Sequence, residues 1–309
     1  MLTSVALNPS IDKTMVVENF ELNKTNRAIS ERTDLGSKGI NVANGAKTLG
    51  VDVTCIGFLF EKNGELFTDN FKDRGIKYDF IMCDGQVRTN IKVVDPKNNT
   101  LTEINGIMPS VNYRHVQRIK ELVEKYAAQS RVMVFAGSLP SGAAADLYRE
   151  LIEICSKYSV KCYLDTSGDA LREGIKAQPF MIKPNLFELE QLFSTKIDSD
   201  AGVVEAARQI ADSGVKCVVV SLGERGAIAV FQNRVYRVKP LNIKAVGTVG
   251  AGDSLLTGIA VTLDRTGDFE YALRVGSACA ASCVTKEGTQ LFVKDEVYRY
   301  VDQIEIEHL

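Results

Sequence analysis

Tryptophan is absent from the 309 residues, histidine occurs only twice, and no apolar run reaches the length that a bilayer requires. His115 and His308 have no nucleophile or metal ligand beside them in the sequence, which argues against histidine-based catalysis. An excess of one charge is also missing, since 37 basic residues face 39 acidic ones. Nucleic acid and anionic lipid membranes are therefore poor partners for this chain, and a small-molecule partner is favoured.

The cysteines show no C-x-x-C spacing of the kind that zinc and redox sites use. Their odd number and scattered positions favour reduced, mostly buried thiols. The first residues lack a charged segment followed by a long apolar one, so we expect the protein to stay in the cytoplasm. The seven cysteines are Cys55, Cys83, Cys155, Cys162, Cys217, Cys279 and Cys283.

Short β-branched runs alternate with longer amphipathic segments through the middle of the chain. Strands are predicted at 132–138, 161–167, 179–185 and 217–223, and helices around 143–157 and near 200–213. This alternation predicts an α/β fold with a three-layer αβα core and a mostly parallel sheet. Ligands of such sheets bind at the carboxyl ends of the strands. The residues at those ends are Gly137, Ser138, Asp165, Lys183, Asn185, Ser221 and Gly223.

Two segments, 13–33 and 86–106, alternate apolar and polar residues and contain turn residues between short strands. They predict a small antiparallel β-sheet, a discontinuous lid beside a core made of residues 1–12, 34–85 and 107–309. A sheet of this kind gains by covering its apolar face, so a homodimer formed through the lid is a further hypothesis.

The sharpest chemical signal is Gly250-Ala251-Gly252-Asp253, where an extended segment runs into an apolar-periodic helix. Backbone N–H groups of such a loop and the helix N-terminus can hold a phosphoryl group, and their field should keep Asp253 ionised. The carboxylate could then accept a proton from an attacking hydroxyl. A helix cap and a tight turn explain the same residues equally well. Neither the P-loop motif nor the G-x-G-x-x-G motif is present, which disfavours a P-loop ATPase and a dinucleotide oxidoreductase.

The second signal is Gly36-Ser37-Lys38-Gly39, followed by Asn41 near the start of a helix. The glycines allow close approach of a ligand and the lysine supplies a mobile cation for a phosphate. A surface turn before a helix is the other explanation.

Together these segments resemble the ribokinase-like, PfkB-type carbohydrate kinases, in which a glycine-lysine-glycine stretch comes early and GAGD comes late. The resemblance covers nearly the whole chain and follows the family's order: LNPSID (7–12), GSKGIN (36–41), VRTNIKV (87–93), TEING (102–106), GSLP (137–140), KPNLFELE (183–190), SLGERGA (221–227) and TVGAGDS (248–254). Two positions depart from it. Ser37 stands where a glycine-like residue is usual, and Gly247 stands where many members carry an aspartate that the phosphofructokinase branch often lacks.

The resemblance implies that Asp253 is the catalytic base and that Gly250, Ala251 and Gly252 form an anion hole. It assigns Asp12 and Asn41 to the sugar hydroxyls, and Lys38 and Arg88 to the phosphate that the sugar already carries. The other substrate-binding candidates that it implies are Arg27, Gly36, Ser37, Gly39, Asn90, Lys92 and Ser138.

For the nucleotide, the resemblance implies ATP contacts from two stretches and a Mg²⁺ ion positioned through water by Glu188. A helix start after Pro184 with an acidic first turn is the structural alternative for Glu188. Adenine is expected between the loop at 221–226 and the helix around 275–283. The nucleotide-binding candidates are Lys183, Asn185, Ser221, Gly223, Gly226 and Cys279.

These roles imply transfer of the ATP γ-phosphoryl group to a phosphorylated ketohexose. Within the family the motifs are most similar to the branch that converts fructose 1-phosphate to fructose 1,6-bisphosphate. Tagatose 6-phosphate and fructose 6-phosphate remain alternative acceptors. A catalytically silent sensor of sugar phosphate or nucleotide is the alternative of a different class.

Overall fold

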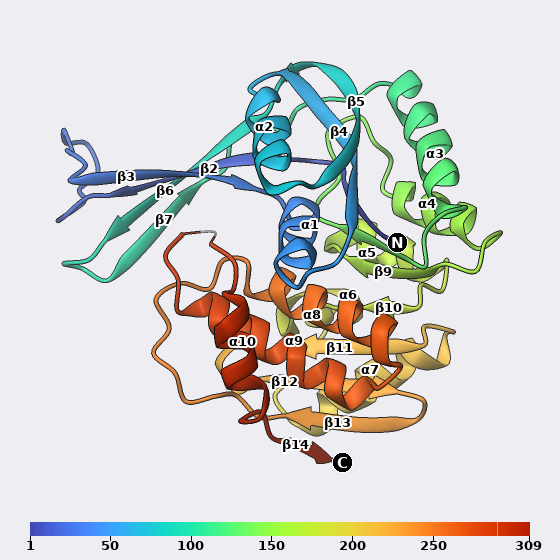
Figure 1. Cartoon of the computed structure of the whole chain (residues 1–309). Coiled ribbons are helices and arrows are strands. Elements are labelled where there is room, and N and C mark those ends of the chain that lie inside the picture. The colour runs from blue at the N-terminus through green and yellow to red at the C-terminus, as the bar shows by residue number, and fades with distance from the viewer. Residues whose placement is uncertain (289) are drawn as a thin grey trace.

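The computed structural model describes residues 1–288 and 290–309, and these residues form two sheets (Figure 1). The larger sheet has ten strands in the order β14-β13-β12-β11-β10-β9-β8-β1-β4-β5, and the seven from β11 to β5 run parallel. The parallel strands are β1 (Leu2–Ala6), β4 (Val53–Lys62), β5 (Lys77–Gln86), β8 (Val132–Ala136), β9 (Lys161–Asp165), β10 (Met181–Ile182) and β11 (Cys217–Ser221). The antiparallel edge consists of β12 (Ala227–Phe231), β13 (Arg234–Val238) and β14 (Ile306–His308).

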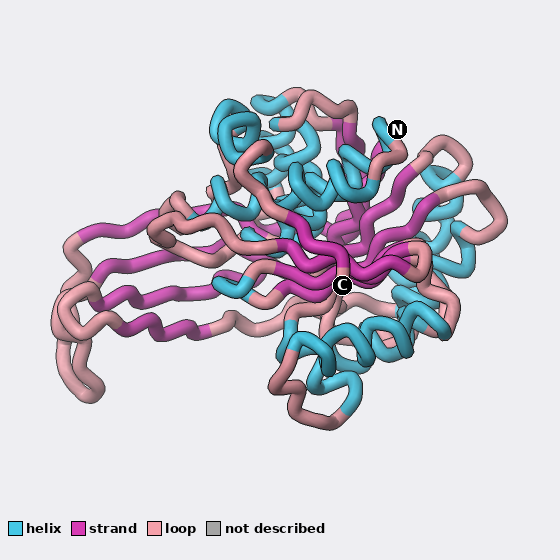
Figure 2. Tube along the Cα trace, turned by 90° about the horizontal axis from the view of Figure 1, so that it is seen from below, coloured by secondary structure: helices cyan, strands magenta, loops and turns pink. Residues whose placement is uncertain are grey.

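Helices cover both faces of the larger sheet, as Figure 2 shows. One layer packs α1 (Lys38–Thr48), α8 (Ala251–Thr266), α9 (Phe269–Val284) and α10 (Lys294–Val301) side by side. The other contains α3 (Tyr113–Ala127), α4 (Leu147–Cys155), α5 (Gly168–Ile175), α6 (Leu186–Phe193) and α7 (Asp200–Asp212). The short α2 (Glu65–Arg74) packs near β5. The predicted three-layer αβα core is confirmed.

The burial of the central strands explains their sequence. Every residue of β1 and β8 is buried, and the first four residues of β11 are also buried. A strand with helices on both faces has no wet side, so its apolar run is continuous rather than alternating. All seven cysteines belong to this interior and are free thiols within the described part of the chain.

The smaller sheet is the lid, which projects from the core in both views (Figures 1 and 2). Its strands are β2 (Ser10–Val16), β3 (Ser30–Gly36), β6 (Arg88–Asp95) and β7 (Thr100–Ile104), in the order β3-β2-β6-β7. The two outer pairings are antiparallel as predicted, whereas β2 and β6 run parallel at the centre. The strands extend a few residues beyond 13–33 at either end, and the division of the chain into core and lid segments stays a prediction.

The described helices include none that is long and apolar enough to cross a membrane.

Candidate active site

A cleft of about 970 Å³ opens at the carboxyl ends of the central parallel strands, next to the lid. Asn8 follows β1 and Ser138 follows β8, and these two strands are neighbours in the sheet. After β1 the chain adds β4 and β5 on one side of it, and then adds β8 and the later strands on the other side. Such a reversal leaves a crevice between the loops that leave the sheet on its two sides. Asp253, Lys38 and Arg88 come from distant parts of the sequence, and all three line this one cleft.

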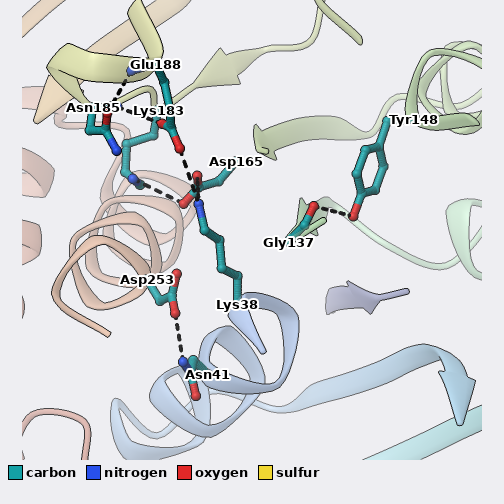
Figure 3. A network of polar contacts seen from close by, with 9 residues as sticks. All are labelled: Lys38, Asn41, Gly137, Tyr148, Asp165, Lys183, Asn185, Glu188 and Asp253. Carbon is teal, nitrogen blue, oxygen red and sulfur yellow. Dashed lines mark hydrogen bonds and ion pairs between the residues drawn. The ribbon is translucent and has the colours of Figure 1, made fainter. Parts of the chain in front are cut away.

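Asp253 lies in the first turn of α8, where the sequence predicts it. The chain enters the helix through Gly250, whose φ of 82° suits a glycine. The Asp253 side chain is buried, and Asn41 Nδ2 donates a hydrogen bond of 2.7 Å to its Oδ2 (Figure 3). The same residue pair thus joins the glycine loop at the start of α8 to the first turn of α1.

The pKa of Asp253 is raised above the ordinary value for aspartate. Burial raises the pKa most, because it removes the carboxylate from water. The ammonium of Lys38 opposes this change, while the negative charge of Asp165 adds to it. A carboxyl with a raised pKa holds a proton more tightly and is the better acceptor for a substrate proton.

Asp165, at the end of β9, holds two lysines in the floor of the cleft (Figure 3). Its Oδ1 lies 2.7 Å from Lys38 Nζ and its Oδ2 lies 3.1 Å from Lys183 Nζ. Burial acts to raise the pKa of Asp165, but the two ammonium groups outweigh it and the net shift is downward. The sequence places Asp165 at a strand end but does not indicate a role for it. Its one sequence signal is a carboxylate directly after a buried strand.

Lys38 contributes its charge beside Asp165 and Asp253. Burial acts to lower the pKa of Lys38, but the carboxylates of Asp165, Asp253 and Glu188 raise it by more. The net shift is upward, so the ammonium stays protonated. Glu188 Oε1 lies 4.0 Å from Lys38 Nζ. The lysine that the family resemblance assigns to the phosphate of the sugar therefore points toward these carboxylates.

Asn185 and Glu188 form a reciprocal cap at the start of α6 (Figure 3). Asn185 Oδ1 accepts from the Glu188 backbone N–H, and Glu188 Oε2 accepts from the Asn185 backbone N–H, both at 2.8 Å. The cap and the proposed site are compatible, because both side chains also line the cleft and Glu188 Oε1 remains turned toward Lys38.

Asp12 is the centre of a polar network on the lid strand β2. Its Oδ1 accepts from Asn90 Nδ2 at 2.8 Å, and its Oδ2 lies 3.1 Å from Lys92 Nζ. Asn90 in turn accepts from the Gly106 N–H at 3.2 Å. Lys92 does not line the cleft, so its predicted contact with a phosphate is replaced by an ion pair that holds the Asp12 carboxylate.

Arg88 and Ser138 line the same end of the cleft. Burial lowers the pKa of Arg88, and the charge of Asp12 opposes this shift. Ser138 Oγ accepts a hydrogen bond of 3.0 Å from Asn8 Nδ2. Asn8 belongs to the LNPSID segment, and no local sequence pattern marks it as a site residue. The Ser138 hydroxyl hydrogen is left free to be donated toward the cleft.

The part of the cleft lined by residues 238–249 and 280–284 is more apolar. The carbonyl oxygen of Val238 leaves no room for a side chain at Gly226, whose φ is 84°. At Gly252 an ideal Cβ would lie 3.1 Å from Lys183 Nζ, so the absence of a side chain lets the ammonium reach the glycine loop. Apolar residues that could pack on a base line this end: Leu241, Ile243, Ala245, Val249, Ala280, Ala281 and Val284.

Besides Lys92, three predicted site residues do not line the cleft. Arg27 is exposed in the loop between β2 and β3. A side chain at Gly39 would meet the Val5 carbonyl oxygen at 2.6 Å, so this glycine serves the packing of α1 on β1. Cys279 faces α8, where its Sγ lies 3.0 Å from an ideal Cβ on Gly258, while Ala280 and Ala281 of the same helix line the cleft.

The other predicted site residues come together in the cleft. They are Asp12, Gly36, Ser37, Lys38, Asn41, Arg88, Asn90, Ser138, Lys183, Asn185, Glu188, Ser221, Gly223, Gly226, Gly250, Ala251, Gly252 and Asp253.

The donor set fits a magnesium ion that keeps most of its waters. The described residues contain no cluster of three or more His, Cys, Asp or Glu side chains that could hold a metal. Glu188 lines the cleft, whereas both oxygens of Asp165 are paired with lysines, and Mg²⁺ is commonly bound by one or two carboxylates together with substrate phosphates and water.

A three-layer core, a lid, and a cleft with a buried carboxylate beside a glycine loop define this protein as a sugar phosphotransferase. Residues 5–296 match the pfkB family carbohydrate kinases. The chain belongs to this family.

Some relatives match this chain along nearly its whole length. The 1-phosphofructokinase of Borreliella burgdorferi is 33% identical over 310 residues, which cover 100% of this chain and 99% of the relative. The tagatose-6-phosphate kinase of Staphylococcus epidermidis is 30% identical, covering 99% and 100%. Phosphofructokinase-2 from Escherichia coli, solved in complex with substrates and products, superposes with a TM-score of 0.90 at 27% identity and 98% coverage of both chains.

Proposed function

We propose that this protein transfers the γ-phosphoryl group of ATP to O6 of fructose 1-phosphate in the cytoplasm, giving fructose 1,6-bisphosphate and ADP. The observation that carries the proposal is the convergence of Asp253, Lys38 and Arg88 on one cleft beside the glycine loop. A 1-phosphofructokinase among the relatives supports the choice of acceptor.

In this mechanism the Asp253 carboxylate accepts the proton of the acceptor hydroxyl as its oxygen attacks the γ-phosphorus. The bond from the γ-phosphorus to the bridging oxygen breaks, and ADP leaves with that electron pair. Lys183 lies next to the glycine loop and Lys38 lies beside Asp253, so the positive charge is in place where negative charge develops. A magnesium ion positioned through water by Glu188 would neutralise further phosphate charge.

A substrate panel tests the acceptor. ADP release is coupled to a dehydrogenase and measured with fructose 1-phosphate, tagatose 6-phosphate, fructose 6-phosphate and free fructose. We expect the highest kcat/KM with fructose 1-phosphate and very little turnover of free fructose, because Arg88 needs a dianion to bind. Efficient turnover of tagatose 6-phosphate with none of fructose 1-phosphate would select the second candidate, which the Staphylococcus relative supports.

We further propose that two copies associate through their lids. The lid face that carries Asp12 and Asn90 serves the cleft, while alternation puts Met15, Ile91 and Ile104 on the other face, where Ile104 is 55% exposed. A second copy would cover this apolar face. Light scattering at micromolar concentration should give about twice the chain mass of 33.9 kDa. A mass equal to one chain would remove the proposal.

A further inference from the structure

Ser37 has a backbone conformation that the rest of the chain reserves for glycine. Its φ is 132° and its ψ is 145°. Among the described residues, the other eight non-glycine residues with positive φ have φ between 50° and 68°, in the left-handed region that asparagine and similar residues tolerate. Ser37 lies outside that region, where only glycine is free of strain. A glycine at this position would make the same turn at lower cost.

The Ser37 hydroxyl makes no hydrogen bond to the described residues of the fold. A serine before a helix usually accepts a hydrogen bond from an N–H of the first turn, but Ser37 makes no such bond to α1. Its Oγ is shielded from water and has no hydrogen-bond partner among the described residues. A buried hydroxyl without a partner is itself unfavourable. The side chain therefore combines two costs, and the folded structure compensates neither.

Arg88 supplies a second unpartnered donor at the same end of the cleft. Its Nε is also buried without a hydrogen-bond partner among the residues described. In the lid sheet, Gly36 and Arg88 flank Ser10 on its two sides, and Ser37 directly follows Gly36 in the chain. Both residues line the cleft. Two buried donors that lack acceptors require a group rich in acceptor oxygens.

Lys38 is engaged elsewhere and is not a third donor to such a group, since its ammonium is directed to Asp165 and Glu188 (Figure 3). We propose that the Ser37 hydroxyl and the Arg88 guanidinium together hold the phosphate that the acceptor sugar already carries. The strain at Ser37 is thus retained because the hydroxyl discriminates phosphorylated from free sugar. This proposal rests on the proposed function and goes further. It assigns the specificity for phosphorylated sugars to a hydroxyl that would be missing if residue 37 were glycine.

Two variants separate the hydroxyl from the backbone. Ser37→Ala removes the hydroxyl and keeps the strained turn, whereas Ser37→Gly removes both the hydroxyl and the strain. We expect both to raise the KM for fructose 1-phosphate by about tenfold to a hundredfold, the range for one hydrogen bond to a charged group. The KM for ATP should not change in either. Ser194→Gly is the matched control, since Ser194 also has positive φ (53°) but ends α6 outside the cleft, and its KM values should stay parental.

A double-mutant cycle with Arg88→Ala tests whether the two side chains hold one phosphate. If they do, the KM of the double variant rises by less than the product of the single increases. A rise equal to the product would overturn the shared contact. Parental KM values in both Ser37 variants would overturn the proposal while the proposed function stands. If the parental protein binds none of the three ketohexose phosphates by calorimetry, both the proposal and the proposed function fall.

Discussion

The Asp253→Asn variant gives the most direct test of the catalytic base. The amide oxygen of the asparagine can still accept the 2.7 Å hydrogen bond from Asn41 Nδ2, so the geometry of the cleft is preserved. What is lost is the ability to take up a proton. A positioned base typically contributes about a hundredfold to ten-thousandfold in rate, so we expect kcat to fall by that factor, which corresponds to about 3–5 kcal/mol of activation free energy.

The pH dependence follows from the raised pKa of Asp253. The base must be ionised to act, so log kcat/KM of the parental enzyme should fall as the pH decreases through that pKa, at a pH above the usual range for aspartate. Folding stability has the opposite dependence, because the folded protein binds this proton more tightly than the unfolded chain does. The stability associated with it is present at low pH and is lost as the pH rises. Asp253→Asn should therefore gain stability relative to the parental protein with increasing pH.

Coupled ADP release gives kcat, calorimetry gives ATP binding, and thermal unfolding at several pH values gives the stability difference. Asp264→Asn is the matched control, since Asp264 lies near the other end of α8, pairs with Arg131 at 2.6 Å and does not line the cleft. It should keep parental turnover. A kcat within threefold of parental in a folded Asp253→Asn protein would refute the assigned role.

Three further substitutions test the surroundings of the base. Lys92→Met leaves the Asp12 carboxylate without its ion pair and should lower the free energy of unfolding by about 3–5 kcal/mol, measured by urea titration. Adding Asp12→Asn to the same chain removes the unpaired charge and should make this loss smaller. Glu188→Gln keeps an oxygen that can accept from the Asn185 N–H but removes the charge, so the Mg²⁺ concentration for half-maximal rate should rise while the melting temperature stays near parental. Arg88→Ala should raise the KM for the sugar phosphate about tenfold to a hundredfold and leave that for ATP unchanged, and equal increases for both substrates would contradict its placement.

The sequence predicts the layers of this fold well because each layer has its own pattern. Continuous apolar runs such as 132–136 are typical of strands covered on both faces, and alternation in 88–95 is typical of a sheet with one polar face. The glycine loop is recognisable because a turn with φ of 82° and a helix start both leave local signals.

What the sequence does not reveal depends on register and on the rotation of helices. Lys92 pairs with Asp12 because β2 and β6 are parallel neighbours, and strand pairing between segments 80 residues apart leaves no local pattern. Gly39 and Cys279 belong to helices that do reach the cleft, but tertiary packing determines which face of each helix lines it. The raised pKa of Asp253 likewise follows from tertiary burial, which outweighs the opposing charges of Lys38 and Lys183.

The lid consists of two chain segments, and the intervening residues 37–87 build α1, β4, α2 and β5 of the core. No single continuous fragment therefore encodes it, and its central pairing joins strands from either side of that intervening unit. Exchange of lids between family members requires both segments to be replaced in matched pairs. A new sugar preference is consequently harder to acquire by recombination at one crossover than by point substitution within the existing strands.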